Sequence, residues 1–317
     1  MIALARLAGR RLLWLPFMVL GITLLVFFVM QFSPTDPATN ALGESATEAA
    51  KQAYRAANGL NDPVFEQYFR FLGGLFTGNL GNTVPPAKPV TTLISTAFPL
   101  TLQLTFLGLV IAVVLALVLG VAAALYRDRW PDQVIRVVSI AGIATPSFWL
   151  AILLIKTFAL DLNWFPSGGY VNPGDSLGGW FASMWLPALA LGVPVAASLT
   201  RVVRTSMVEE LDRDYVRTAI GSGLPMHVVV GRNVLRNALI TPVTVLGLRV
   251  GYLLGGAVVI EVIFDLPGMG ELILNGVTSG DTNLVQGVTL VIALTFVVVN
   301  IVVDLLYLVI NPRIRAV

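Results

Sequence analysis

The chain has 317 residues, of which 56% are hydrophobic and only 12% are charged, and its mean hydropathy is +0.83. Soluble domains carry about 25% charged residues, so this composition excludes an ordinary water-soluble fold. Cysteine is absent, which excludes disulfides, iron–sulfur ligation and thiolate chemistry. The apolar residues come in long blocks that leave little material for a separate globular unit, so we expect one membrane domain over residues 1–317.

Six apolar segments are long enough to cross a hydrocarbon core about 30 Å thick, which predicts an all-α transmembrane fold with about six transmembrane helices. The first could be a secretory signal, but its 21 residues exceed the roughly 7–15 of a signal core and favour an uncleaved span. The fourth has 17 residues and two internal prolines, so we expect it to borrow a turn from each flank and to bend. The segments are Leu12–Phe32, Phe98–Leu125, Val137–Leu160, Met184–Thr200, Ile240–Phe264 and Val285–Ile310.

The distribution of basic residues predicts the orientation, because cytoplasmic loops retain Lys and Arg. The N-terminus, the second and fourth loops and the C-terminus together hold 14 of the 20 basic residues, whereas the third and fifth loops hold none. Both termini and the fourth loop, residues 201–239, are therefore expected in the cytoplasm. The first loop, residues 33–97, is expected outside.

The external loop is predicted to be structured rather than a plain linker. Ser45 followed by Glu48 is a capping-box pattern, Gly59 is placed to end a short helix, and a second helix is expected to start at Asp62–Pro63. The second helix is expected to lie in the outer membrane interface or to pack as a lid on the protein, and periodicity does not separate the two. Its apolar residues at helical spacing are Phe65, Phe69, Leu72 and Phe76, with Tyr68 and Phe71 beside them.

No catalytic or metal-binding motif stands out in the sequence. The phosphate-binding pattern GxxxxGK[ST] is absent, so the chain is not expected to be an ATPase. The sole histidine is His227, and the motif HExxH is missing. Ser222 lies five residues from His227 without an obvious orienting carboxylate, so we interpret His227 as a solvated loop residue. We therefore expect no catalytic residue, no metal ligand and no cofactor in this chain.

The fourth loop contains a short amphipathic helix on a charged background. Tyr215, Val216, Ala219 and Ile220 give it a narrow apolar face, and Ala219 allows the close approach of another backbone. Gly223 is predicted to end the helix, after which Leu224–Pro225 turns the chain away. Such a projection suits docking into a groove on a partner, although a helix at the membrane surface would look similar.

Four ionisable residues lie in the predicted spans, where charge is costly and normally faces protein or water. Arg249 lies about ten residues into the fifth span, so we expect it to face the translocation path or to pair with an acid, such as Glu261 or one from a partner subunit. Glu261, near the outer end of the same span, could belong to an external gate with the turn FDLPGMG. Lys156 can snorkel to the outer surface, and Asp304 is interpreted as an anchor near the inner end.

The fourth loop also resembles a known family. The stretch DYVRTAIGSGLPMHVVVGRNVLRNALITPVTVLGL looks like the cytoplasmic coupling loop of binding-protein-dependent ABC importer permeases, specifically the B-type subunit of dipeptide and oligopeptide permeases. The family motif consists of Glu-Ala-Ala, three further residues and a glycine. Here Arg217–Thr218–Ala219 and Gly223 occupy those positions, and Arg236 stands where the general motif has proline. Other segments resemble the family in the expected order along nearly the whole chain, among them LGGLFTGNLGNTV, ATPSFWLAILL, WFPSGGY, TRVVRTSM and GGAVVIEVIFDLPGMGELI.

The resemblance implies a type I ABC importer permease architecture, with import of peptides across the bacterial plasma membrane by alternating access. It implies three kinds of partner: a homologous C-type permease subunit, two cytoplasmic ATPase subunits that bind ATP and Mg²⁺, and an external peptide-binding protein. The chain itself is expected to contact membrane lipid and not to bind nucleic acid. The cargo could be a dipeptide, a longer peptide, glutathione or a metal chelate. The implied ATPase-coupling helix comprises Asp214, Tyr215, Val216, Arg217, Thr218, Ala219, Gly223 and Leu224.

Two other classes of function were weighed against this one. An ion-coupled secondary transporter needs carboxylates inside the membrane and commonly shows inverted repeats, yet the spans offer only Glu261 and Asp304, both near span ends. A membrane enzyme needs a nucleophile, a base or a metal cluster, and the sequence suggests none.

Overall fold

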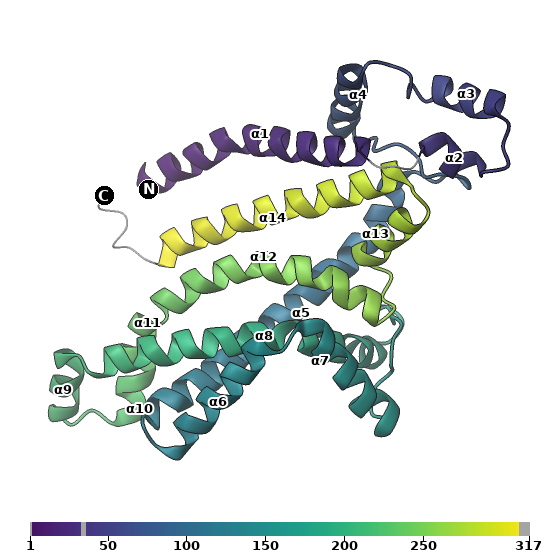
Figure 1. Cartoon of the computed structure of the whole chain (residues 1–317). Helices are drawn as coiled ribbons and strands as arrows, with labels where there is room; N and C mark the ends of the chain where they lie inside the picture. Colours follow the sequence, from purple (N-terminus) through teal and green to yellow (C-terminus); the bar gives the residue numbers. More distant parts are fainter. Residues whose placement is uncertain (1, 33–35, 311–317) are drawn as a thin grey trace.

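The computed structural model of the chain describes residues 2–32 and 36–310, and every regular element in these two ranges is a helix (Figure 1). Five helices are long and apolar enough to cross a membrane, and a bent pair makes a sixth if it counts as one span. The predicted all-α transmembrane fold with about six transmembrane helices is confirmed. The five helices are α1 (Ile2–Gln31), α5 (Val90–Leu125), α8 (Leu177–Leu211), α12 (Ile240–Ile263) and α14 (Thr282–Ile310).

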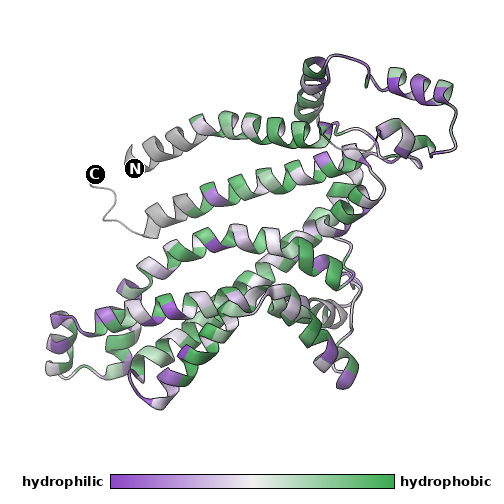
Figure 2. Ribbon diagram, viewed as in Figure 1, coloured by the Kyte–Doolittle hydropathy of each residue, from purple (hydrophilic) through white to green (hydrophobic). Residues whose placement is uncertain are grey.

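Shorter helices lie at the two ends of the bundle. Figure 2 shows apolar residues along the spans, with hydrophilic residues gathered around α9 at one end and α3 at the other. The group at one end is α2 (Pro37–Leu42), α3 (Glu48–Ala57), α4 (Val64–Thr77) and α13 (Met269–Thr278). The group at the opposite end is α9 (Asp214–Gly221), α10 (Met226–Val228), the π-helix η2 (Val229–Val234) and α11 (Leu235–Ala238).

The prediction of a single third span over Val137–Leu160 was wrong. This segment is divided between α6 (Trp130–Ala144) and α7 (Ser147–Leu154), which continues into the π-helix η1 (Ile155–Asp161), and the two parts are bent by 104°. Pro146 causes the break, because its ring disfavours a helical conformation at the preceding residue, and Thr145 is extended with φ −83° and ψ 117°.

The fourth span is much longer than the 17 apolar residues of Met184–Thr200. It extends at both ends, as expected, and α8 reaches 35 residues. The helix continues through Pro187 and Pro194 rather than breaking there. It is also the most enclosed span, with 72% of its most apolar window buried inside the chain, so its prolines face protein rather than lipid.

The core of the bundle is the contact between α5 and α8. Gly108 of α5 lies against Leu191 of α8, and a side chain at Gly192 would meet the Gly108 carbonyl oxygen at 2.6 Å. Nearer the α9 end, Gly120 of α5 lies against Val203 of α8. Helices in lipid gain little from hydrophobic burial, so small residues that allow close van der Waals contact are what hold such a pair together.

Two capping predictions in the external loop had different outcomes. The capping residue of α3 is Thr47, whose Oγ1 accepts a hydrogen bond from the Ala50 amide at 3.3 Å, so the assignment to Ser45 was wrong. Gly59 does follow the helix with a positive φ of 63°. The two candidates for this cap are separated by one residue, and both have the hydroxyl that the role needs.

An ion pair ties α2 to α3. Asp36 caps α2, and its Oδ2 also accepts a hydrogen bond from Arg55 Nη2 of α3 at 2.6 Å. This hydrogen bond from Arg55 is the largest cause that lowers the pKa of Asp36 to about 2. Because the folded pKa lies below the unfolded one, the pair contributes its stability above about pH 4 and loses it as the pH falls towards 2.

Helix α4 lies against the end of α1 that is remote from α9 (Figure 1), and it has two apolar faces. One face packs on α1, where the Tyr68 hydroxyl lies 3.0 Å from Thr23 Oγ1 and the Tyr68 ring meets Phe27 edge-on. Thr23 lies eight residues inside the outer end of α1, a depth of about 12 Å. On the other face, Phe69 and Phe76 are 65% and 80% exposed, so this chain does not cover it.

We predict that the open face of α4 is immersed in the outer leaflet, since its neighbour Tyr68 contacts α1 well inside the membrane-spanning range. The chain has no native cysteine, so a spin label can be placed at Phe69→Cys, with Arg70→Cys as the control, because Arg70 is exposed and lies about 100° further round α4. The label at 69 should be accessible to oxygen and shielded from a water-soluble nickel chelate, and the label at 70 should show the reverse. Equal access of the chelate to both positions would contradict the prediction.

Candidate coupling surface and translocation path

The helix predicted in the fourth loop is α9, and it ends as the sequence suggested. Gly223 has φ +84°, and its amide donates to the Ile220 carbonyl at 2.9 Å. The Leu224 amide donates to the Ala219 carbonyl at 3.2 Å. This pair of bonds is a Schellman motif, which requires a left-handed residue at the position that Gly223 occupies.

The apolar residues of α9 divide between two faces. Val216 is buried and Ala219 is half-buried in an inner cluster that contains Val203 and Met207 of α8 and Val229 of η2. The small side chain of Ala219 therefore allows α9 to pack closely on this chain's own backbone. Ala219 is not the residue of α9 that is most exposed to a partner. The residues that remain open at this end are Tyr215, Ile220, Leu224 and Met226.

Polar contacts fix the orientation of α9. The Tyr215 hydroxyl donates to Glu210 Oε2 at 2.7 Å and accepts from Asn237 Nδ2 at 3.3 Å. Burial is the main cause that raises the pKa of the Tyr215 phenol, so it stays protonated and donates to the carboxylate. Thr218 Oγ1 donates back to the Asp214 carbonyl at 3.1 Å, and Asp214 lies 3.6 Å from exposed Arg217. The tip of α9 is thus an exposed apolar patch beside basic residues.

A buried ion pair that the sequence analysis missed connects the second loop to α8. Asp132 of α6 is 0% exposed, and its two oxygens accept hydrogen bonds from Arg204 Nε and Nη2 of α8, each at 2.6 Å. Asp132 Oδ2 also accepts from the Asp128 amide at 3.0 Å. A bidentate arginine–carboxylate pair has a defined geometry as well as charge attraction, so α6 and α8 are held in one relative orientation.

A second contact fastens the same loop close to α9. Arg127 Nη1 donates to Asp212 Oδ2 at 2.8 Å, and Asp212 directly follows the last residue of α8. Only Asp212 and Arg213 separate α8 from α9. We therefore predict that a displacement of α9 would pass into α8, and through the two ion pairs into the loop that joins α5 to α6. We call Asp132–Arg204 and Arg127–Asp212 the inner clamp.

Arg249 lies in the middle of α12 and does not pair with Glu261. Its Nη2 donates to Ser198 Oγ of α8 at 2.9 Å. The two charged residues are twelve positions apart on one helix, a separation of about 18 Å, so the suggested ion pair was wrong. No carboxylate of the described side chains lies within ion-pair distance of Arg249. The Arg249 guanidinium is half-buried and donates to a neutral hydroxyl, so its remaining N–H groups can donate hydrogen bonds to another group.

Glu261 is buried beneath the turn between α12 and α13. Its Oε2 accepts a hydrogen bond from the Gly270 amide at 2.7 Å, and a side chain at Gly268 would collide with its carboxylate. Thr101 of α5 accepts from the Met269 amide at 3.0 Å, next to the same turn. Glu261 therefore lies at the outer end of the span, as predicted, where it holds the FDLPGMG turn in place. Its role in a gate stays a prediction.

Lys156 Nζ lies 2.8 Å from Asp161 Oδ2, and both side chains are exposed. The snorkelling of Lys156 to the outer surface stays a prediction. His227 is exposed at the start of the segment after α9. The side chain of Asp304, interpreted as an inner anchor, lies outside the described residues.

The architecture is that of a multi-pass membrane protein with a projecting helix clamped to its most buried span. Residues 4–105 match the family described as "Binding-prot-dependent transport system membrane comp, N-term", and residues 116–316 match "Binding-protein-dependent transport system inner membrane component". The chain belongs to this family of ABC importer permeases, the inner-membrane components of binding-protein-dependent transport systems.

The curated relatives cover nearly the whole chain. A putative peptide transport system permease protein of Brucella abortus is 38% identical over 94% of this chain and 95% of its own length. The glutathione transport system permease protein GsiC of Escherichia coli is 37% identical over 96% and 97%. The probable D,D-dipeptide transport system permease protein DdpB of Escherichia coli is 36% identical over 96% of each chain. A solved amino acid ABC transporter crystallised with histidines is 18% identical, with a TM-score of 0.49 over 70% of this chain and 94% of that one.

Gly223→Val is predicted to uncouple ATP hydrolysis from transport without removing the chain from the membrane. No atom lies within 4 Å of the Gly223 Cβ position, so the cost comes from the positive φ and is on the order of 1–3 kcal/mol at the end of α9. Gly221→Ala is the matched control, because Gly221 is helical and equally uncrowded. Uptake per membrane-inserted chain should fall with Gly223→Val and persist with Gly221→Ala. Equal uptake by both variants would contradict the role given to the turn.

The inner clamp is predicted to serve transmission as well as stability. Asp132→Leu alone leaves the half-buried Arg204 guanidinium unpaired and should cost about 1–3 kcal/mol, whereas Asp132→Leu with Arg204→Leu removes both charges and should recover most of the thermal stability. The double variant should nevertheless move less cargo than the wild type for each ATP hydrolysed. Thermal unfolding and coupled uptake of the assembled transporter measure the two effects. Full uptake by the double variant would mean that the clamp is only structural.

Proposed function

We propose that this chain is one of two channel-forming permease subunits of an ATP-driven importer that carries peptides into the bacterial cell. The observation that supports this most strongly is that relatives matching 94–96% of the chain are named for peptide, glutathione and D,D-dipeptide transport. All three cargoes are short peptides or close derivatives. The whole of residues 1–317 would then form one permease domain.

The energy would come from partner subunits. The sequence has no phosphate-binding loop, so ATP and Mg²⁺ would bind to two cytoplasmic ATPase subunits, and this chain would not itself be an enzyme. A homologous C-type permease would complete the pore, and an external binding protein would deliver the cargo. The exposed apolar tip of α9 beside Arg213 and Arg217 supports docking of an ATPase there, because one helix face is free and basic residues flank it.

The orientation we propose puts α9 and both chain termini in the cytoplasm. In Figure 1 the start of α1 and α9 lie at one end of the bundle, while α2, α3 and α4 lie at the other. This arrangement agrees with the excess of basic residues in the loops at the α9 end.

The mechanism would be alternating access driven through α9. Closure of the ATPases would displace α9, and the inner clamp would carry that displacement into α8, α6 and α5 together. Rigid-body tilting of these packed helices would open the path outward and inward in turn. Arg249 and Glu261 would belong to the path and its outer turn, respectively.

An ion-coupled carrier is less well supported by the geometry. Coupling needs a carboxylate that exchanges an ion or proton with the path. Glu261 is instead buried, and it accepts a backbone hydrogen bond from Gly270.

Uptake by the assembled transporter tests the proposal directly. The chain, its partner permease, the ATPases and the binding protein are reconstituted in vesicles, and a radiolabelled tripeptide is offered from the binding-protein side. Uptake should require ATP and should not respond to a proton gradient. Uptake driven by the gradient alone would overturn the proposal in favour of an ion-coupled carrier.

Arg249→Ala is predicted to lower uptake about 10- to 100-fold without lowering the amount of chain in the membrane, because a charge-assisted hydrogen bond to a peptide carboxylate is worth about 1.5–3 kcal/mol. Ser198→Ala is the control, since it removes the neutral partner of Arg249 and leaves the cation. It should retain most of the uptake. Wild-type uptake by Arg249→Ala would remove Arg249 from the path.

A further inference from the structure

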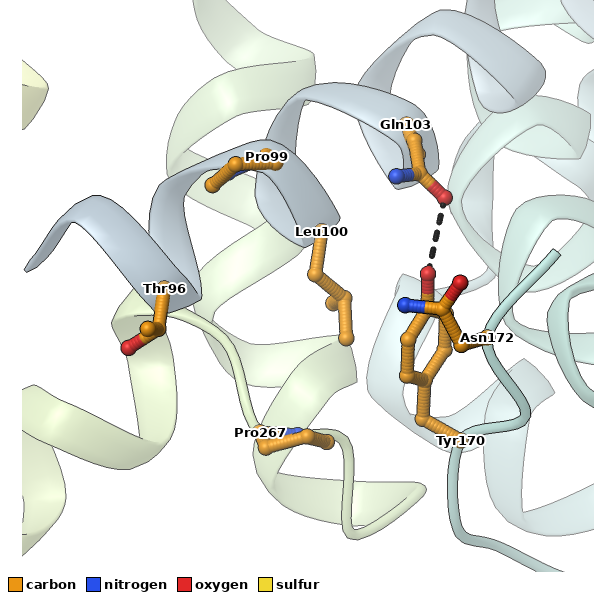
Figure 3. Close-up of a pocket in the computed structure, with 7 residues that line it drawn as sticks. All are labelled: Thr96, Pro99, Leu100, Gln103, Tyr170, Asn172 and Pro267. Atoms are coloured by element: carbon orange, nitrogen blue, oxygen red, sulfur yellow. Dashed lines mark hydrogen bonds between the residues drawn. The ribbon is translucent and has the colours of Figure 1, made fainter. Parts of the chain in front are cut away.

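A neutral pocket opens at the outer end of the bundle, on the far side from α9. It encloses about 350 Å³, within the range of about 300–1,000 Å³ typical of small-molecule sites. Three separate segments form it: the outer part of α5, the loop before α8 and the turn held by Glu261 (Figure 3). The lining residues are Thr96, Pro99, Leu100, Gln103, Tyr170, Asn172 and Pro267.

Gln103 is held in one orientation within this pocket. Its Oε1 accepts a hydrogen bond from the Tyr170 hydroxyl at 3.2 Å (Figure 3) and a second one from Trp180 Nε1 at 2.8 Å. An indole N–H can only donate, so it identifies the amide atom that faces Trp180 as the oxygen. Both lone pairs of that oxygen are then engaged, and the Gln103 NH₂ group keeps its donors for another acceptor.

The chemistry of the other lining residues restricts what that acceptor can be. None of the lining side chains is a carboxylate or a basic group, so the pocket does not compensate a charged ligand. Pro99, Leu100 and Pro267 instead offer apolar surface. A neutral carbonyl next to an apolar side chain fits this combination, and that is the chemistry of an internal residue in a peptide.

We propose that this pocket binds an uncharged residue of the peptide cargo as it enters the path, with the peptide carbonyl accepting from the Gln103 NH₂ group and its side chain against Pro99, Leu100 and Pro267. This proposal rests on the peptide-import function proposed above and assigns a cargo contact to this chain. Tyr170 and Trp180 act as positioning residues for the Gln103 amide.

Gln103→Glu tests the donor without removing its support. The variant keeps an oxygen for Tyr170 and Trp180 and exchanges the NH₂ group for a second acceptor. In the reconstituted transporter, the KM for uptake of an alanine tripeptide should rise about 3- to 10-fold or more, the loss expected for one neutral hydrogen bond. Asn163→Asp makes the same chemical exchange at an exposed outer position that does not line the pocket and should leave KM unchanged. A KM within twofold of wild type for Gln103→Glu would overturn the proposal.

Disulfide trapping tests the location with Gln103 intact. A tripeptide with a central cysteine, activated as a mixed disulfide, is offered to Asn172→Cys, and Thr278→Cys at an exposed outer position is the control. The tripeptide should attach to Asn172→Cys faster than to the control, with and without the binding protein. Equal rates would overturn the proposal, and so would attachment of the tripeptide to Asn172→Cys only when the binding protein is present. If the wild-type transporter shows no ATP-driven uptake, the proposed function is wrong. If wild-type uptake is normal but the Gln103→Glu and trapping experiments both give the negative result, only the proposed role of the pocket is wrong.

Discussion

The close contact between α5 and α8 is the constraint on which the rest of the structure depends. Lipid tails are as apolar as the side chains they would replace, so two spans adhere through close packing and satisfied polar groups. Gly108 and Gly192 provide the close packing, because a side chain at Gly192 would clash with the Gly108 carbonyl oxygen and one at Gly108 would press on Leu191. The most buried span, α8, then becomes a scaffold that α6, α7 and α12 also contact.

The charged groups of the bundle differ in how they are satisfied. Asp132 and Arg204 pair with each other at the α9 end, and Glu261 Oε2 accepts a hydrogen bond from a backbone amide at the opposite end. Arg249 has only the neutral Ser198 among the described side chains. A charge in a membrane span that is not paired with an opposite charge is costly to keep, which favours a function for Arg249 over a purely structural role.

Sequence alone predicted the features that depend on local patterns. Length and hydropathy located the spans, and Gly223 was identified because few other residues adopt a positive φ at a helix end. The break at Pro146 was missed because the apolar run continues across it. The inner clamp could not be predicted, since Asp132 and Arg204 are 72 residues apart and meet only after α6 folds back on α8. The same holds for Gln103, which is 67 residues from Tyr170 and 77 from Trp180, and for the inward orientation of Ala219.

The central claim is that force enters this chain through α9, and cross-linking from that helix tests it most directly. The chain lacks cysteine, so a photoreactive label can be placed at Ser222→Cys on the exposed end of α9, with Ser279→Cys at the opposite end of the bundle as a control. In the assembled transporter the label at 222 should attach to an ATPase subunit and stop uptake, and the label at 279 should do neither. Attachment of the ATPase from the loop around Arg129 but not from position 222 would contradict the account.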